Sequence, residues 1–218
     1  NKLRGNSDIS VYREGAHGVP TFVKGNLSEE VTRSGEEVAT ALQFFHTHKG
    51  AYRMVNPDEE LRVNRMDTDE LGMRHLRFDQ MYEGLRVIGS DLIAHFAADG
   101  RLTVVNGTFE PYIDLDVTPA LPNDQAIEIA DRELQNFFGK TEPADSPELV
   151  VFPWEGTNYL AWRFFMRSDS PPGRWECFID ARSGEVVYLA NRIQELDVWG
   201  TGVRVLGDTT QWLDVSQS

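Results

Sequence analysis

Two segments with helical periodicity, each followed by β-like segments, constrain the fold of this chain more than any other feature of its sequence. Apolar residues recur in both segments at the spacing of one helix face. They are Val38, Ala41, Leu42 and Phe45 in the first segment, and Ile127, Ala130, Leu134 and Phe137 in the second. Short turns join the β-like segments, and strands joined in this way pair antiparallel. The sequence therefore predicts an α+β fold of two lobes in series, each an amphipathic helix packed on an antiparallel β-sheet.

The residues around each helix predict where it begins and ends. Ser34 is a candidate N-cap, and Glu37 three residues later completes a capping box. Gly50 is the expected end of the first helix, and Gly139 that of the second. Alternating apolar residues between turn residues predict strands at 21–27, 51–55, 60–66, 73–82, 85–97, 101–113, 149–153, 159–167, 174–180 and 185–190.

These elements divide the chain into four parts. An acidic, proline-containing connection between Asp114 and Pro122 marks the boundary between the lobes. The expected parts are a polar segment at 1–26, a first lobe at 27–114, a second lobe at 115–190 and a linker with a further β-like start at 191–218.

Charge and composition exclude several classes of partner. The chain has 21 Lys and Arg against 35 Asp and Glu, a formal charge of −14. Phosphate neutralisation supplies much of the affinity for nucleic acids, so an acidic chain is a poor match for them and for anionic membranes. No run approaches the roughly 18 consecutive apolar residues of a membrane-spanning helix. The single cysteine, Cys177, excludes an internal disulfide and a cysteine-rich zinc site.

No catalytic or metal-binding constellation is present in the sequence. None of the five histidines lies in a His-Glu-x-x-His motif, which places two zinc ligands one helical turn apart. His46 and His48 have the nearest metal-like spacing, but on a helix residues i and i+2 point about 200° apart. Cys177 alternates with Trp175 and Ile179 on one face of a predicted strand, which favours a core thiol over a nucleophile. The chain is therefore not expected to be an enzyme by itself or to bind a metal.

Aromatic residues crowd the predicted sheet of the second lobe, and two interpretations stay open. They are core residues, or part of the sheet is a docking face, because aromatic side chains concentrate in interface cores. The candidates for such a face are Trp154, Trp162, Phe164 and Trp175.

A phrase at residues 75–92, HLRFDQMYEGLRVIGSDL, carries a family resemblance. It resembles the propeptide of thermolysin-like secreted metalloproteases, in which the pattern H-x-R-[FL]-x-Q-x-Y-x-G-[LI]-x-V-x-G recurs. Residues 126–134, 160–162 and 178–186 are similar to a PepSY domain. Residues 200–209 resemble the first strand of the mature protease, and the family's zinc ligands and catalytic glutamate have no counterpart in this sequence.

The resemblance implies a pro-segment of a secreted, bacterial zinc metalloendopeptidase. Such a segment acts as an intramolecular chaperone and as an autoinhibitor that autoprocessing removes. Its partner would be the cognate catalytic domain in cis, and zinc and calcium would belong to that domain, with no cofactor in this chain. Covalent attachment gives an inhibitor an effective concentration of millimolar order, so a modest interface suffices.

The resemblance also implies where the chain is cut, because thermolysin-like enzymes prefer a large aliphatic residue after the scissile bond. Arg192–Ile193 is the first choice and Glu195–Leu196 the second. The inhibitory segment expected to enter the active-site cleft consists of Asn191, Arg192, Ile193, Gln194, Glu195 and Leu196.

Two other functions remain open at this stage. One is a free-standing secreted protease inhibitor or binding module with the same fold, although the protease-like segment 200–208 argues against it. The other is a ligand-binding domain that uses the aromatic sheet as its cleft.

Overall fold

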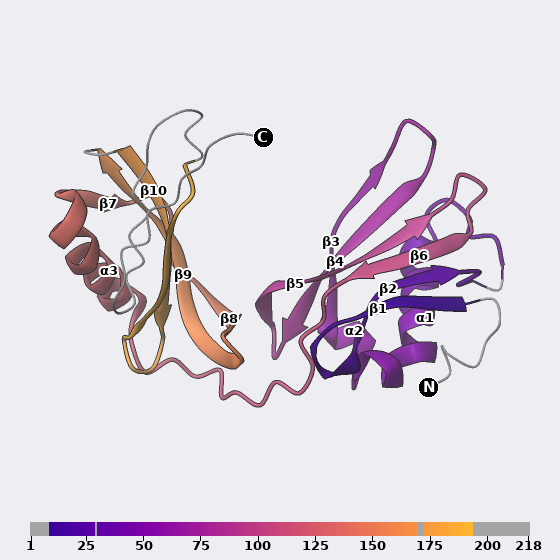
Figure 1. Ribbon diagram of the computed structural model, residues 1–218, viewed down its shortest axis with the longest axis horizontal. Helices are drawn as coiled ribbons and strands as arrows, with labels where there is room; N and C mark the ends of the chain where they lie inside the picture. Colours follow the sequence, from indigo (N-terminus) through magenta and orange to yellow (C-terminus); the bar gives the residue numbers. More distant parts are fainter. Residues whose placement is uncertain (1–8, 29, 170–171, 194–218) are drawn as a thin grey trace. The chain divides into compact units, whose positions relative to one another are not determined.

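The computed structural model describes residues 9–28, 30–169 and 172–193 (Figure 1). The chain divides into two compact units. One holds the residues up to Thr118 together with 150–160, and the other holds 119–149 and the residues from 161 onward. Helices and largely antiparallel strands make up both units, which confirms the predicted α+β class.

The first unit contains six antiparallel strands with a long helix on one face (Figure 1). The strand order is β1-β2-β6-β5-β4-β3. Its helices are α1 (Glu37–Tyr52), α2 (Pro57–Glu60) and the 3₁₀ turn η1 (Ala16–Gly18). Its strands are β1 (Ile9–Glu14), β2 (Pro20–Gly25), β3 (Leu61–Thr68), β4 (Arg74–Tyr82), β5 (Leu85–Phe96) and β6 (Leu102–Gly107).

Aromatic side chains form the contact between α1 and the sheet. Phe45 is fully buried, and its ring meets that of Phe78 on β4 edge to face, with 6.0 Å between the ring centroids. Phe44 and Tyr52 extend this cluster along α1. Edge-to-face pairs at this separation add to the stabilisation from buried area. The helix thus covers the inner face of the sheet and leaves the opposite face open.

The two ends of α1 differ from the prediction. The helix begins at Glu37, and no side chain caps it, so the Ser34 capping box is wrong. Glu37 instead accepts a hydrogen bond from the Gly35 N–H (2.8 Å) and forms an ion pair with Arg74. The helix also continues through Gly50, so the strand expected at 51–55 is absent. Tyr52 is 1% exposed, and its burial against Phe45 outweighs the local preference of glycine to end a helix.

The segment before residue 21, expected to be loop, contains β1. Ile9 is buried, and the strand pairs antiparallel with β2 from Ile9 opposite Gly25 to Glu14 opposite Pro20. Its outer position in the sheet explains why its sequence pattern is weak, because only one flank of the strand is covered by another strand of this unit.

The second unit packs one helix on a twisted antiparallel sheet (Figure 1). The helix is α3 (Asn123–Phe138), followed by Gly139 as predicted. Its buried alanines, Ala126 and Ala130, lie against Cys177 and Ile179 in one core cluster. Its strands are β7 (Thr141–Pro143), β10 (Pro172–Asp180), β11 (Val186–Asn191) and the part of β9 (Thr157–Asp169) from residue 161 onward. Most of β8 (Glu148–Trp154) and the start of β9 belong to the first unit, where Val151 of β8 pairs with Val87 of β5 in parallel. β9 and β11 flank β10, and β7 pairs with β9.

Candidate processing site at the end of β11

The predicted cleavage segment begins where β11 ends. Asn191, the last residue of β11, pairs with Trp175 on β10. The ladder continues for one further hydrogen bond, from the Arg192 N–H to the carbonyl oxygen of Arg174 (2.7 Å). The side-chain oxygen of Asn191 accepts from the Arg174 N–H (3.1 Å) and the Ile193 N–H (3.0 Å). The chain is therefore held to the sheet through Arg192, and Ile193 lies beyond the last residue pair of the β10–β11 ladder.

A buried carboxylate holds the side chain of Arg192. Glu176 on β10 is only 5% exposed. Its Oε2 accepts from Nε and Nη2 of Arg192, both at 2.6 Å. Its Oε1 accepts from Nε and Nη2 of Arg163 on β9, both at 2.7 Å. Hydrogen bonds between ionised groups are short and about twice as strong as neutral ones, so Glu176 joins the two arginines firmly.

The strand register explains why these three side chains meet. Glu176 stands opposite Phe165 of β9 and opposite Ala190 of β11. Arg163 and Arg192 each lie two residues from those positions, so both are diagonal neighbours of Glu176 on the same face of the sheet. Long side chains reach across such a diagonal. We call Glu176, Arg163 and Arg192 the arginine clamp.

Aromatic rings flank the arginine clamp on this face. The Arg163 guanidinium lies over Phe165, 5.3 Å from the ring centroid, and the Arg192 guanidinium lies over Tyr188 at 6.0 Å. Such contacts attract the cation to the ring face and restrict where the guanidinium can lie. The arginine clamp itself consists of one carboxylate and two guanidinium groups and contains no nucleophile.

Only part of the predicted inhibitory segment can be placed. Asn191, Arg192 and Ile193 lie together as described above, and Ile193 is 40% exposed. Gln194, Glu195 and Leu196 lie outside the described residues.

The predicted aromatic docking residues lie mostly on the face that carries α3. Phe164 is buried in the core cluster beneath α3, and Trp162 and Trp175 pack against that cluster. The indole N–H of Trp162 donates to the carbonyl oxygen of Leu121 (2.8 Å). Trp154 lies in the 150–160 stretch of the first unit and stacks on Phe152. These positions are what the core interpretation expects, and a docking role stays a prediction.

The residues that complete the clamp, Glu176 and Arg163, were not singled out from the sequence. Alternation along 174–180 places Glu176 on the face opposite Cys177, and a carboxylate inside an otherwise apolar strand was the available signal. Its pairing with Arg163 depends on the register of β9 and β10, which the sequence does not specify. Cys177 is fully buried, and burial raises the pKa of its thiol, as a core thiol requires.

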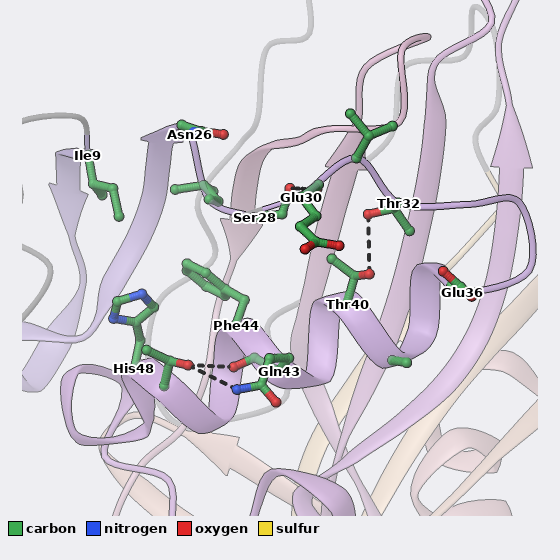
Figure 2. Close-up of a pocket in the computed structure, with 14 residues that line it drawn as sticks. Ile9, Asn26, Ser28, Glu30, Thr32, Glu36, Thr40, Gln43, Phe44 and His48 are labelled. Atoms are coloured by element: carbon green, nitrogen blue, oxygen red, sulfur yellow. Dashed lines mark hydrogen bonds between the residues drawn. The ribbon is translucent and has the colours of Figure 1, made fainter.

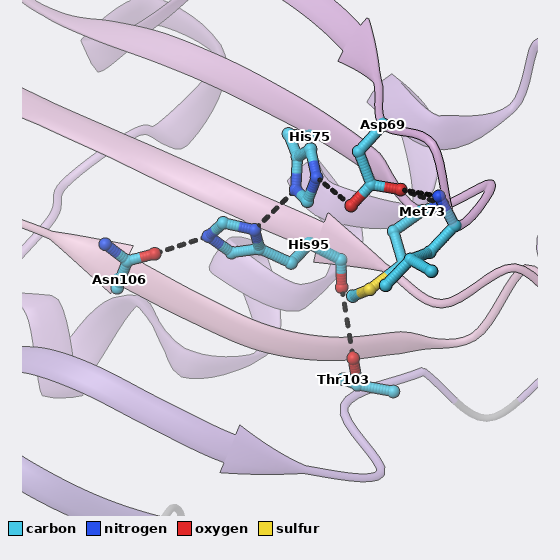
Figure 3. A network of polar contacts seen from close by, with 7 residues as sticks. Asp69, Met73, His75, His95, Thr103 and Asn106 are labelled. Atoms are coloured by element: carbon cyan, nitrogen blue, oxygen red, sulfur yellow. Dashed lines mark hydrogen bonds and ion pairs between the residues drawn. The ribbon is translucent and has the colours of Figure 1, made fainter.

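A polar network crosses the open face of the first unit (Figure 3). Asp69 contacts Nε2 of His75 (3.1 Å), and the two Nδ1 atoms of His75 and His95 lie 2.7 Å apart. Nε2 of His95 meets the side-chain oxygen of Asn106. The two Nδ1 atoms are close enough for one of them to donate a hydrogen bond to the other. Burial lowers the pKa of His95.

A groove of about 760 Å³ runs between α1 and the segment 26–32 (Figure 2). Thr32 donates to Thr40 across it (3.2 Å), and Glu30 and Glu36 add negative charge to its lining. Nothing in this lining forms a catalytic pair. Among the described residues no group of three or more His, Cys, Asp or Glu side chains is placed to bind a metal ion.

Several residues of the phrase at 75–92 have structural roles. Glu83 and Gly84 both have positive φ angles, 46° and 83°, and make the two-residue turn between β4 and β5. Gln80 is 3% exposed and exchanges two hydrogen bonds with the backbone of Glu110 (2.7 and 2.8 Å). The Tyr82 hydroxyl accepts from the Leu115 N–H (3.2 Å). The phrase thus fixes a hairpin and the segment that follows β6.

Residues 59–109 match the fungalysin/thermolysin propeptide motif. The match spans β3 to β6, including the polar network of the open face. This segment is therefore similar to a propeptide motif. It ends before α3, so the arginine clamp lies outside it.

Curated relatives of the chain are bacterial proteases. Bacillolysin of Brevibacillus brevis is 30% identical over 208 residues, which is 91% of this chain and 38% of the relative. Thermostable neutral protease NprT of Geobacillus stearothermophilus is 31% identical over 88% of this chain and 36% of its own length. Thermolysin of Alicyclobacillus acidocaldarius is 32% identical with the same coverage. The chain therefore spans less than two fifths of the length of these relatives.

Among solved structures, the YpeB C-terminal domain of Bacillus megaterium aligns with 14% identity and a TM-score of 0.41, over 89% of this chain and 92% of that one. A likeness at this level supports no conclusion about fold or function. No described helix is long and apolar enough to cross a membrane.

Proposed function

We propose that this chain is the pro-segment of a thermolysin-like zinc metalloendopeptidase, which assists the folding of the catalytic domain and inhibits it until cleavage. The observation that carries the proposal is the propeptide motif at 59–109, together with 30–32% identity to bacillolysin and thermolysin over about nine tenths of the chain. The partner is the cognate catalytic domain in cis, secreted with this chain.

Inhibition in this scheme depends on covalent attachment. A tethered inhibitor acts at an effective concentration of millimolar order, so the interface needs no high intrinsic affinity. Zinc and calcium belong to the catalytic domain in this proposal. We also assign the second half of the chain, 115–190, to a PepSY-like lobe and 27–114 to the propeptide-motif lobe.

We place the cut at Arg192–Ile193, with Glu195–Leu196 as the alternative. The position of Ile193 supports this choice, because its side chain is exposed where the β10–β11 ladder ends. Ile193 is the first described residue beyond the β10–β11 ladder and is 40% exposed, with the large aliphatic side chain that the family resemblance implies after the cut.

Two measurements test the proposal. The 218-residue chain is titrated against the mature protease from the same precursor, with heat-unfolded chain as the control. Dose-dependent inhibition by the folded chain alone is expected, and equal activity with both forms would refute the inhibitory role. N-terminal sequencing of the mature enzyme should find Ile193 or Leu196, and a start at Gly200 or later would refute both cleavage assignments.

A further inference from the structure

We infer that Glu176 is a positioning residue for processing: through the arginine clamp it holds Arg192 on the sheet and so fixes the position of the Arg192–Ile193 bond on the second unit. The inference rests on the proposed function, because it assigns a role in cutting the same precursor at Arg192–Ile193. It concerns how this chain presents the bond, not the protease that cuts it.

The clamp acts on the residue next to the bond. Arg192 is held at two points, by its backbone N–H on the Arg174 carbonyl (2.7 Å) and by its guanidinium on Glu176 (2.6 Å). The Ile193 N–H donates to the side-chain oxygen of Asn191 (3.0 Å). Arg192, the residue before the Arg192–Ile193 bond, is therefore anchored on the sheet through both its backbone and its side chain.

The design of the clamp fits a holding role. Arg163 occupies Oε1 of Glu176 and leaves Oε2 for Arg192. When the Arg192 side chain is removed or moves away, Glu176 keeps Arg163 as a cationic partner. Its buried negative charge therefore stays paired. The side chain of Arg163 is 23% exposed and that of Arg192 is 50% exposed. Arg163 therefore contributes mainly to the fold of the sheet, and Arg192 is the more accessible of the two arginines.

Two consequences follow for processing. The guanidinium of Arg192 is bound to Glu176 of the same chain and is not available to the protease. Recognition of the bond by the protease therefore depends on the side chain of Ile193, the residue after the cut. Hydrolysis adds water across the amide and leaves a carboxylate on Arg192 and an amine on Ile193. The new C-terminus then stays ordered on the sheet, and an ordered end loses less conformational entropy when it binds the protease.

The experiment compares variants of the full precursor. Glu176→Gln keeps the shape of the side chain and leaves the cleaved sequence unchanged. Arg192→Gln removes the outer arm while Arg163 still neutralises Glu176, so this variant keeps the test valid if Glu176→Gln does not fold. The matched control is Glu142→Gln, which breaks the ion pair of Glu142 with Arg167 between β7 and β9, where both side chains are 59% exposed.

Mass spectrometry of the mature N-termini is the primary readout. We expect Glu176→Gln and Arg192→Gln each to lower the ratio of cutting at Arg192–Ile193 to cutting at later bonds by about tenfold, the effect of losing a hydrogen bond between charged groups. The double variant should lose no more than either single one, and Glu142→Gln should match the unaltered precursor. In the 218-residue chain, the Arg192 N–H should exchange faster in Glu176→Gln.

The possible failures are distinguishable. If the unaltered precursor is cut at Arg192–Ile193 and Glu176→Gln leaves the ratio unchanged, the inference is wrong and the proposed function stands. A cut of the unaltered precursor at Glu195–Leu196 also overturns the inference, because Arg192 then does not precede the bond. A precursor that is not processed between 192 and 196 overturns the proposed processing site as well.

Discussion

Replacing Glu37 with alanine should destabilise the first unit by about 3–5 kcal/mol, the usual cost of removing one partner from a buried ion pair. Glu37 is 2% exposed and is the first residue of α1. One of its oxygens pairs with Arg74 on β4, which is 16% exposed, and the other accepts from the Gly35 N–H. The substitution would leave Arg74 poorly solvated over the Phe96 ring, 5.9 Å from its centroid. It would also release the start of α1 from the sheet.

The assay is urea and thermal unfolding of the 218-residue chain, with hydrogen exchange to localise the loss to β3–β6. At about 2–4 °C per kcal/mol for a chain of this size, the unfolding midpoint should fall by about 6–20 °C. The control is Asp67→Ala, which removes the ion-pair partner of Arg65. The side chains of Arg65 and Asp67 are 60% and 59% exposed, so this substitution should lower the free energy of unfolding by less than about 1 kcal/mol. If Glu37→Ala costs no more than Asp67→Ala, the assignment of Glu37 as the anchor of α1 is wrong.

Three further predictions concern other parts of the chain. Burial lowers the pKa of His95 below its usual value, so the unfolded state takes up a proton at this site before the folded state does as the pH falls. The free energy of unfolding should therefore decrease as the pH falls below about 6.5, and His95→Gln should flatten that decrease in pH-dependent urea titrations. Phe78 is fully buried beneath α1, so Phe78→Ala should lower the free energy of unfolding by about 3–5 kcal/mol in the same titrations. Leu71 is 78% exposed, and Leu71→Ala should lower it by less than about 0.5 kcal/mol. Similar losses for the two variants would contradict the packing described. Cys177 should resist alkylation in the native chain and react only on unfolding, because burial raises the pKa of its thiol, and rapid labelling of folded chain would contradict its place in the core.

Periodicity predicted α3 and its end at Gly139, because a polar segment follows that helix and local chemistry decides where it stops. It failed at the end of α1. There Gly50 is a local stop signal, but Tyr52 packs on Phe44 and Phe45, and tertiary contact extends the helix by half a turn. Sequence periodicity therefore predicted that α1 exists, but tertiary packing determined the residue at which it ends.

The candidate site was predicted in part, for a related reason. The choice of Arg192–Ile193 came from family resemblance and the side chain of Ile193, both of which are properties of the linear sequence. The clamp required knowledge that Glu176 stands between Phe165 and Ala190 in register. A slip of one residue on either flanking strand would turn its arginine to the other face, so no linear pattern specifies the contact.

The most direct test of the central claim is the sequence of the reading frame after Ser218 in the source DNA. A pro-segment of a thermolysin-like protease predicts an in-frame His-Glu-x-x-His motif with a glutamate ligand downstream, within the length of one catalytic domain. A stop codon immediately after Ser218 would contradict the account and leave a free-standing inhibitor or binding module as the function to examine.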